Sequence, residues 1–333
     1  LHPEYWGDNY KQEANIEFNS NENLVDWDGD GSADWDTEDQ KGFSPIGNEG
    51  TSFMGSYNGN SHTISGLYIN RPSTDHVGLF GYIGYDYGPQ IINLGLLNID
   101  ITGNDKVGAL IGYKNGYTVN NCYALSGSVS GNDEVGGLIG YCGYADMERC
   151  YTNCNVSGNS SIGGLIGNTY TAGPEFIKQS YSLGDVSGTS KVGGLIGNNY
   201  MIGYQNCYSR GNVTRTSGSE INFGGFIGIN SAGSDILYSY STGAVYSSPG
   251  NIWGDNDGLT DDKGFLGEED NPGGHYTFNY TANFFDSDAS NQSTDAVGSA
   301  TPKTTDKMTN ATTTNNIYLA AGWDFVGESN NGS

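Results

Sequence analysis

The apolar residues of this chain recur in short extended runs, and one run returns throughout the sequence. It reads VGGLIG at Val135–Gly140, where small and large apolar residues follow one another over six positions. The large residue at the place of Leu138 recurs at intervals of 31, 28, 27, 30, 31 and 39 residues: Leu79, Leu110, Leu138, Leu165, Leu195, Phe226 and Phe265. Intervals of this size indicate a repeat architecture.

Two further signatures accompany the repeats. One is a small residue followed by tyrosine: Cys122-Tyr123, Cys150-Tyr151, Ser180-Tyr181, Cys207-Tyr208 and Ser239-Tyr240. The other is a lone valine shortly afterwards: Val129, Val156, Val186, Val213 and Val245. Because Gly, Asn, Asp and Ser separate the runs, each repeat predicts three short strands joined by turns. No window has the apolar spacing of a helix, and the frequent glycines would destabilise one.

Three strands and their corners account for a coil of about 28 to 31 residues. Successive coils would stack as parallel strands ~4.8 Å apart, each pairing its backbone with the coils above and below. We therefore predict an all-β fold, a parallel β-helix or β-solenoid with N- and C-terminal caps. The usual hand of parallel crossovers favours right-handed winding. Leu138, Leu165 and Leu195 should then lie on adjacent strands.

The repeats resemble the GLUG-motif family, which occurs in bacterial surface proteins, including adhesins and IgA-peptidase-like proteins. The resemblance rests on the GLFG, ALIG, GLIG, GFIG and GFLG tetrads and extends from about Phe43 to Phe325. It includes FSPIGN (Phe43–Asn48), SYNGNSHTISGLYINRP (Ser56–Pro72), TTDKM (Thr304–Met308) and AGWDF (Ala321–Phe325). The resemblance implies a β-solenoid at a cell surface and carries no catalytic signature.

The pattern divides the chain into four parts. Residues 1–42 would form an N-terminal cap that contains a strand-like run, Tyr10–Phe18, and an acidic loop. Such a cap covers strand edges that the first coil would otherwise leave unpaired. Residues 43–245 are the solenoid body, and residues 246–282 are an acidic insertion that explains the interval of 39. Residues 283–333 are the last coil, the C-terminal cap and a tail.

The acidic loop predicts a calcium site. Its candidate ligands are Asp26, Asp28, Asp30, Asp34 and Asp36. Numbered from Asp26, carboxylates stand at positions 1, 3, 5 and 9 and glycine at position 6, which matches the beginning of an EF-hand-type loop. Thr37 at position 12 departs from that pattern, so a solvated acidic turn is the alternative. The mutual repulsion of closely spaced carboxylates favours calcium.

Charge and composition limit the partners. The chain has 13 Lys and Arg against 38 Asp and Glu, a formal net charge of −25, which would repel nucleic acid and anionic membranes. No apolar run approaches the ~18–20 residues that cross a bilayer, and Leu1–Tyr5 lack the features of a signal peptide. Because Gly, Asn, Ser, Thr and Tyr dominate, we expect a secreted or cell-surface protein whose partner is a glycan or another cell-surface ligand. The sequence leaves the oligomeric state open.

The cysteines predict packing and no metal site. Three of them share a repeat position with two serines, which predicts a buried ladder of small residues: Cys122, Cys150, Ser180, Cys207 and Ser239. Cys142 and Cys154 lie off this ladder and could pair in an oxidising compartment. The chain has no CxxC motif and no histidine near the cysteines, so no zinc site is expected.

The recurring tyrosines that follow this ladder predict a stacked column. Because side chains alternate along a strand, the tyrosines and their Cys or Ser neighbours cannot both point inward. We favour the tyrosines as core filling, with an outward platform for sugar rings as the alternative. Five other aromatic residues are expected near corners or in the insertion, where they could contact a ligand: Tyr113, Tyr141, Tyr144, Tyr204 and Trp253.

Catalytic signals are weak. The sequence has no GxSxG, HExxH or phosphate-binding loop, and no repeat position accumulates acids as a ladder. The basic residues that a lyase could use are thinly spread: Arg71, Lys114, Arg149, Lys178 and Arg210. We therefore predict an adhesion or binding module with glycans as the expected ligand, and no catalytic residues. The alternative is a β-helical carbohydrate-active enzyme, either a polysaccharide lyase or a glycoside hydrolase.

Overall fold

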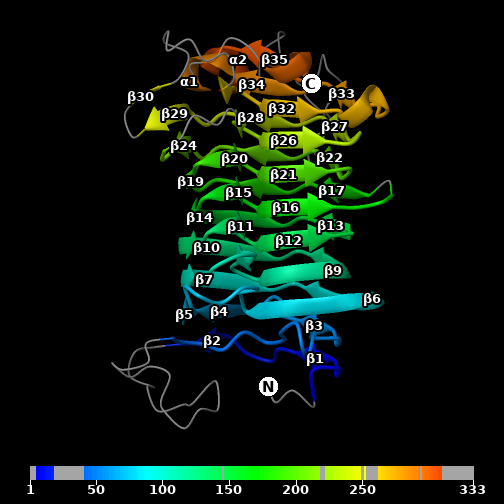
Figure 1. Ribbon diagram of the computed structural model, residues 1–333. Helices are drawn as coiled ribbons and strands as arrows, with labels where there is room; N and C mark the ends of the chain where they lie inside the picture. Colours follow the sequence, from blue (N-terminus) through cyan, green and yellow to red (C-terminus); the bar gives the residue numbers. More distant parts are fainter. Residues whose placement is uncertain are drawn as a thin grey trace, which may run out of the picture.

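The computed structural model describes residues 5–18, 41–144, 146–173, 175–217, 222–248, 251–252, 262–290, 292 and 295–309. They form a parallel β-solenoid of about six turns with ~30 residues per coil, which confirms the predicted fold class. The coils stack into an elongated body with β1 (Tyr10–Lys11) and β2 (Ile16–Glu17) at one end (Figure 1). At the other end lie β35 (Thr301–Lys303) and α2 (Thr305–Thr309). None of the helices in these residues has the length and hydrophobicity to span a bilayer.

Each coil passes through three parallel sheets, which we call sheets A, B and C. Sheet C has six strands and carries the first part of each VGGLIG run: β8 (Val107–Gly108), β11 (Asp133–Gly136), β15 (Ser160–Gly163), β20 (Ser190–Gly193), β25 (Phe223–Gly224) and β31 (Asp262–Lys263). The chain then turns into sheet A, continues into sheet B and returns to sheet C one coil further on.

Sheet A has fourteen strands and bends once along its width. Its strands are β1, β3 (Tyr57–Asn58), β6 (Phe80–Ile92), β9 (Ile111–Asn120), β12 (Ile139–Gly143), β13 (Asp146–Glu148), β16 (Ile166–Tyr170), β17 (Phe176–Lys178), β21 (Ile196–Tyr200), β22 (Gly203–Gln205), β26 (Ile227–Ser231), β27 (Asp235–Leu237), β32 (Leu266–Asp270) and β33 (Asn279–Thr281). The long strand β9 pairs with both β12 and β13, so it continues through the bend. In the later coils the strand is divided in two at this bend.

Sheet B has fifteen strands. They are β2, β4 (Thr63–Ser65), β5 (Tyr68–Asn70), β7 (Gly95–Thr102), β10 (Tyr123–Ser130), β14 (Tyr151–Ser157), β18 (Tyr181–Ser182), β19 (Val186–Gly188), β23 (Tyr208–Ser209), β24 (Val213–Arg215), β28 (Tyr240–Ser241), β29 (Val245–Ser248), β30 (Asn251–Ile252), β34 (Phe284–Asp286) and β35. Strands β29 and β30 pair antiparallel, unlike the coil strands. Beyond β31 the chain also forms short helices: η2 (Pro272–Gly274), α1 (Ser287–Ser290), η3 (Ala296–Gly298) and α2.

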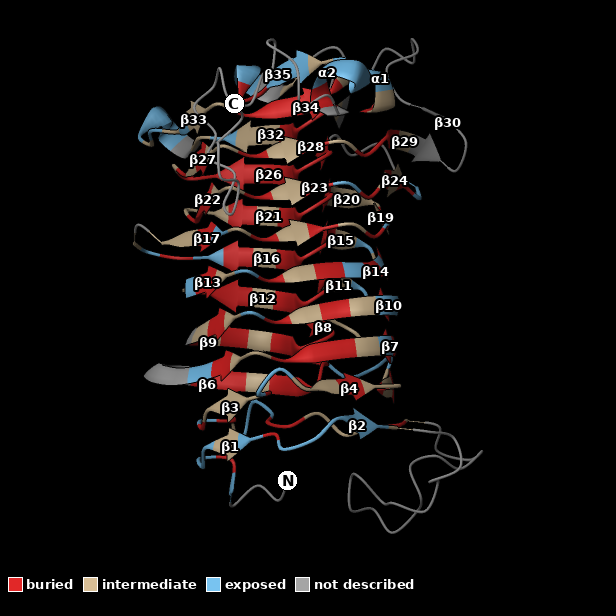
Figure 2. Ribbon diagram, turned by 180° about the vertical axis from the view of Figure 1, so that it is seen from behind, coloured by how far each residue is buried: buried red, intermediate tan, exposed pale blue. Residues whose placement is uncertain are grey.

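The VGGLIG runs form the ladder that the sequence predicts. The backbone N–H of Leu138 donates to the carbonyl of Leu165 at 2.9 Å, and that of Leu165 donates to Leu195 at 2.9 Å. The ladder continues through Phe226 and Phe265, and all of these side chains are buried. Buried residues accordingly run through every coil (Figure 2). The apolar repeat therefore builds a continuous core along the solenoid.

The glycines of the motif permit close approach between coils. A Cβ at Gly136 would lie 2.6 Å from the backbone nitrogen of Gly167 in the next coil, and one at Gly140 would lie 2.4 Å from the carbonyl carbon of Lys106 in the preceding coil. Real Cβ atoms do not approach backbone this closely, so only glycine fits. The motif therefore marks the corner where sheet C turns into sheet A.

The small-residue ladder is confirmed, and the core interpretation of its tyrosine neighbours is wrong. All five Cys and Ser side chains of the ladder are fully buried, whereas Tyr123, Tyr151, Tyr181, Tyr208 and Tyr240 are half-buried on the outer surface of sheet B. The alternation of side chains along each strand places the smaller residue inside. Cys142 and Cys154 are buried free thiols, so the pairing that an oxidising compartment would allow is not formed.

The caps contain elements that the sequence only partly predicted. The Tyr10–Phe18 run contributes β1 and β2, which pair with β3 and β4 of the first coil. At the other end, TTDKM, one of the stretches on which the predicted GLUG resemblance rests, forms most of α2. The acidic loop at residues 26–39 and most of the acidic part of the insertion, residues 253–261, lie outside the described residues.

Candidate functional site on the outer wall of sheet A

The strands of sheet A that follow the VGGLIG corner present two outward columns of side chains. We call them the first wall column, which contains Tyr82, Tyr113, Tyr141, Asn168 and Asn198, and the second wall column, which contains Asn115, Gly143, Tyr170 and Tyr200. The residues of each column are in register on adjacent parallel strands. The side chains between the columns point inward and are buried: Lys114, Cys142, Thr169 and Asn199. This alternation follows from the strand period of two.

The tyrosines of the first wall column stack face to face. The ring centroids of Tyr82 and Tyr113 are 4.4 Å apart, and those of Tyr113 and Tyr141 are 4.9 Å apart with an interplanar angle of 6°. Burial, and then the neighbouring Tyr82, raises the pKa of Tyr113 to about 12. At neutral pH Tyr113 therefore offers a protonated hydroxyl and a ring edge, while stacking on both sides largely covers its ring faces.

His76 closes one side of this stack. Its ring lies edge-on to Tyr82 and Tyr113, with centroid distances of 5.1 and 5.5 Å. Burial lowers the pKa of His76, and the charge of Lys106 lowers it further. The imidazole is therefore mostly neutral at pH 7 and packs as an aromatic ring.

The second wall column contains the most exposed ring of the wall. Tyr170 stacks on Tyr200, with centroids 5.0 Å apart and planes 15° apart. Tyr170 is 43% exposed, whereas the tyrosines of the first wall column are half-buried. In Figure 2 the end of β16, where Tyr170 lies, is correspondingly coloured as exposed.

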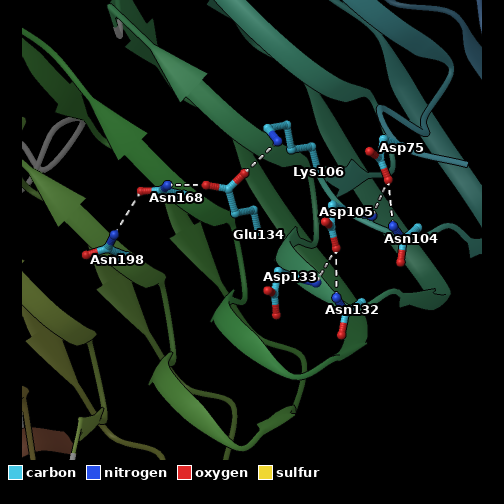
Figure 3. A network of polar contacts seen from close by, with 9 residues as sticks. All are labelled: Asp75, Asn104, Asp105, Lys106, Asn132, Asp133, Glu134, Asn168 and Asn198. Carbon is cyan, nitrogen blue, oxygen red and sulfur yellow. Dashed lines mark hydrogen bonds and ion pairs between the residues drawn. The ribbon is translucent and has the colours of Figure 1, made fainter.

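A ladder of acids lines the adjacent corner, before sheet C, contrary to the expectation that no repeat position accumulates them. Asp105 accepts hydrogen bonds from Asn132 Nδ2 at 2.9 Å and from the backbone N–H of Asp133 at 3.1 Å (Figure 3). Asp75 accepts the equivalent pair from Asn104 and Asp105, one coil earlier. Asp105 and Asp133 each stand five residues before the large tetrad residue, Leu110 or Leu138, and Asp75 stands four before Leu79, so aligning these coils could have identified the ladder.

The acids of this corner have a structural role in linking coils. Each carboxylate receives a side-chain amide and a backbone N–H from the next coil, and such charge-assisted hydrogen bonds are strong. Within the described part of the chain, no group of His, Cys, Asp and Glu side chains could hold a metal ion. The predicted calcium ligands Asp26, Asp28, Asp30, Asp34 and Asp36 lie outside that part, so the calcium site stays a prediction.

Glu134 connects the corner to the wall. Its carboxylate lies 3.3 Å from Lys106 Nζ and accepts a hydrogen bond from Asn168 Nδ2. Asn168 Oδ1 in turn accepts a hydrogen bond from Asn198 Nδ2 at 3.1 Å (Figure 3). These contacts fix the orientation of the Asn168 amide on the outer wall.

Two residues that the sequence offered as candidates for a ligand-binding or catalytic site are buried beneath sheet A. Tyr204, expected to be exposed, is fully buried, and its hydroxyl donates to Asn199 Oδ1 at 2.9 Å. Lys114, considered as a cation for an enzyme, is also fully buried and donates to the carbonyls of Gly143 at 3.3 Å and Tyr144 at 2.8 Å. The expected exposure of Tyr204 is wrong, and Lys114 is no surface cation, because both positions face inward.

The tyrosine column on sheet B is also stacked. Its centroid distances are 4.9, 4.8, 4.6 and 4.9 Å, in order from Tyr123 to Tyr240. At its start, a Cβ at Gly95 would lie 2.3 Å from the Tyr123 ring, so the backbone of Gly95 lies against that ring. The column therefore exposes edges and hydroxyls, and does not form the open platform of ring faces that was the alternative interpretation.

The remaining candidates have different outcomes. Tyr144 is half-buried at a corner, where its backbone N–H donates to the Tyr170 carbonyl at 2.9 Å. Trp253 lies outside the described residues. Sequence reasoning missed Tyr170 and Tyr200, although both follow a tetrad in the same way, as GNTY and GNNY. That shared tetrapeptide is the signal that could have identified them.

A separate pocket of about 510 Å³ lies at the N-terminal end of the core, between the β1–β2 segment and the first coil. Its lining is mostly apolar and includes Phe18, Phe43 and Ile64. The polar groups there are engaged with each other, since the Tyr57 hydroxyl donates to Gln12 Oε1 at 3.1 Å. The pocket does not include any residue of the two wall columns.

Comparison with known proteins gives partial similarity only. Over 103 residues, 31% of this chain, the sequence is 38% identical to halomucin of Haloquadratum walsbyi, and the match spans 1% of that protein. Over 43 residues, 13% of this chain, it is 46% identical to a protein of Evansella cellulosilytica described as a Gly-rich membrane protein, and the match spans 5% of it. No protein-family model and no solved structure matches the chain. The GLUG resemblance therefore stays a prediction.

Proposed function

We propose that this chain is a β-solenoid module, outside the cell or on its surface, that binds neutral glycans through the outer wall of sheet A. The observation that carries this proposal is the composition of the two wall columns, which present only Tyr, Asn and Gly from Tyr113 to Tyr200. Protonated phenol and amide groups donate and accept hydrogen bonds without charge, as sugar hydroxyls do. The wall thus matches the chemistry of a neutral polysaccharide.

The repeat of the wall supports a polymeric ligand. Its groups recur once per coil, at centroid spacings of 4.4 to 5.0 Å, so a chain of sugars lying along the solenoid axis would meet similar groups several times. Linked weak contacts of this kind give useful avidity. The net charge of −25 disfavours uronic-acid or sulfated polymers, because their charges would be repelled.

The surface location has its own support. The first relative is named halomucin, and the second is described as a membrane protein. The Gly-, Asn- and Ser-rich composition of this chain agrees with such a setting. Adhesion to a cell surface or to extracellular polysaccharide is the role that we propose.

Binding to a panel of polysaccharides tests the proposal. We expect titration calorimetry to detect binding of neutral polymers and little or no binding of polygalacturonate at moderate salt. Binding confined to acidic polymers, or absence of binding to any neutral member, would contradict it. Reducing ends and the ultraviolet signal of unsaturated products are followed in the same samples, and catalytic release of oligosaccharides would favour the enzyme alternative.

Calcium is part of the proposal as a structural ion of the N-terminal acidic loop. An ion that binds only the folded state raises the thermal midpoint by mass action. Titrating calcium into chelator-treated protein should therefore raise the midpoint, and the double substitution Asp28→Ala with Asp30→Ala should abolish the rise. An unchanged midpoint in the parent protein would show that the loop binds no calcium.

A further inference from the structure

We propose that one sugar ring of a neutral glycan stacks on Tyr170, at the place where the tyrosines of the wall change from the first column to the second. We call this place the aromatic step and define it by Tyr141, Gly143, Asn168 and Tyr170. The inference rests on the proposed function and names the subsite that carries it.

The aromatic step arises from a change of pattern between two adjacent strands. On β12, Tyr141 occupies the first wall column and Gly143 the second, whereas on β16, Asn168 occupies the first and Tyr170 the second. The strands are in register, so Gly143 lies next to Tyr170 and Tyr141 next to Asn168. Each of the two rings therefore has a ring on one side and none on the other.

Three structural observations describe the side of Tyr170 that faces β12. Within the described residues, the ring of Tyr170 stacks only on Tyr200. A Cβ at Gly143 would have Asn115 Oδ1 at 3.0 Å and the Lys114 carbonyl oxygen at 3.3 Å as its nearest atoms, and no ring atom as close. Tyr170 is also 43% exposed.

Other glycines of the solenoid show the contrast. A Cβ at Gly95 would lie 2.3 Å from the Tyr123 ring, and one at Gly203 would lie 2.6 Å from the Phe176 ring. In both places an aromatic side chain leans over the glycine and covers its own face. At Gly143, which is itself buried, the three nearest atoms belong to Asn115 and Lys114 and none to a ring. A sugar ring on this side therefore contacts the exposed part of Tyr170 together with the Asn115 amide.

Amide groups beside the open face can bind sugar hydroxyls. Asn168 contacts Glu134 through Nδ2 and Asn198 through Oδ1, which holds the amide in place. An asparagine side chain has two donors and two acceptor positions, so further hydrogen bonds remain open to it. Asn115 lies one strand below Gly143 in the second wall column and supplies a second amide.

The chemistry of the aromatic step defines the class of sugar. A pyranose with equatorial hydroxyls presents an apolar face of C–H groups, which packs on an aromatic ring while its hydroxyls reach polar groups around the edge. None of the four residues of the aromatic step is basic. Lys114, which lies behind the step, is buried and does not reach its surface. We therefore infer β-linked glucose or N-acetylglucosamine polymers as ligands, in preference to uronates.

Two substitutions test the aromatic step from opposite directions. Tyr170→Ala removes the ring, and Gly143→Tyr adds a ring where it would cover the open face and extend the Tyr170–Tyr200 stack. Tyr181→Ala is the matched control, since that ring is stacked on both sides in the sheet B column. The probes are cellohexaose and chitohexaose, with polygalacturonate as the acidic comparison, and thermal midpoints verify that every variant is folded.

We expect Tyr170→Ala and Gly143→Tyr each to weaken binding of the better hexasaccharide by about tenfold, the size of one aromatic contact. Tyr170→Phe, which keeps the ring, and Tyr181→Ala should bind within about twofold of the parent. If the parent binds a hexasaccharide and folded Tyr170→Ala or Gly143→Tyr binds equally well, the aromatic step is excluded while the proposed function stands. If the parent binds neither neutral probe nor any neutral polymer, both are overturned.

Discussion

Gly140 tests, at the scale of a single residue, whether close approach between coils explains the repeat motif. A Cβ there would lie 2.4 Å from backbone atoms of Lys106 and Val107 in the preceding coil. Backbone cannot move aside as a flexible side chain can, so Gly140→Ala should lower the free energy of unfolding by about 1–3 kcal/mol, the range of overpacked cores. Urea unfolding followed by circular dichroism measures the change.

Gly173 supplies the control for this substitution. A Cβ at Gly173 would meet no atom within 4 Å, so Gly173→Ala should change the stability by no more than about 0.5 kcal/mol. Equal effects of the two substitutions would show that contact between coils does not explain the motif.

The buried thiols predict how stability depends on pH. Burial raises the pKa of Cys154 and Cys207 from 9.0 to about 12. Above pH 9 the unfolded chain releases thiol protons that the folded chain retains, so these groups leave stability unchanged below pH 9 and reduce it as the pH rises from 9 towards 12. Each thiol contributes a slope of up to about 1.4 kcal/mol per pH unit in that window.

Unfolding in urea at pH 7 to 10.5, with reductant present, measures this slope. Cys207→Ser should make it smaller, because a hydroxyl does not titrate in this range. Ser180 and Ser239 already occupy the equivalent place in other coils and are buried, so the variant is expected to fold. An unchanged slope in Cys207→Ser would mean that the buried thiols do not cause the pH dependence.

At the scale of an element, the sheet B tyrosine column behaves as a series of neighbouring contacts. Tyr151 and Tyr181 stack with centroids 4.8 Å apart and planes 9° apart. A double-mutant cycle with alanine at both positions should give a coupling free energy of about 0.5–1.5 kcal/mol. The same cycle on Tyr151 and Tyr208, which are separated by the Tyr181 ring, should give less than about 0.5 kcal/mol. Similar coupling in both pairs would contradict a column of nearest-neighbour contacts.

The tyrosine column of sheet B and the tyrosines of the sheet A wall have different consequences, although both are stacked. A continuous stack covers its own ring faces and stabilises the sheet, as on sheet B. An interrupted stack leaves a ring face at its end, as at Tyr170 beside Gly143. The binding potential of the wall thus depends on where the column is broken.

At the scale of the whole molecule, a net charge of −25 predicts stabilisation by salt. Repulsion among the acids destabilises the compact state, and the Debye length falls from about 10 Å at 0.1 M salt to about 3 Å at 1 M. The thermal midpoint should therefore rise as potassium chloride increases from 0.1 to 1 M. A midpoint that falls over this range would show that charge repulsion does not limit the stability.

The substitution Asp105→Asn tests whether part of the charge repulsion arises in the ladder of acids at the corner before sheet C. The asparagine keeps an acceptor oxygen for Asn132 and for the backbone N–H of Asp133, while it removes the charge between Asp75 and Asp133. The variant loses the charge assistance of these two hydrogen bonds together with the repulsion from its neighbours, so we expect its stability to rise less with added salt than that of the parent. An equal gain would place the repulsion elsewhere on the molecule.

The sequence by itself determined the coil, its repeat and its core ladder. Apolar spacing, turn residues and motif glycines are local and periodic, and parallel pairing copies each coil onto the next, so Leu138, Leu165 and Leu195 could be placed on adjacent strands. The same reasoning placed Cys122, Cys150 and Cys207 in one buried ladder.

Only the tertiary structure decided which side of a strand each residue occupies and which residues meet across coils. A shift of one residue turns a side chain from outside to inside, which is why Tyr204 and Lys114 are buried and Tyr170 is exposed. The open face of Tyr170 depends on Gly143 in the neighbouring coil, a relation that follows from strand register and has no signature within either strand.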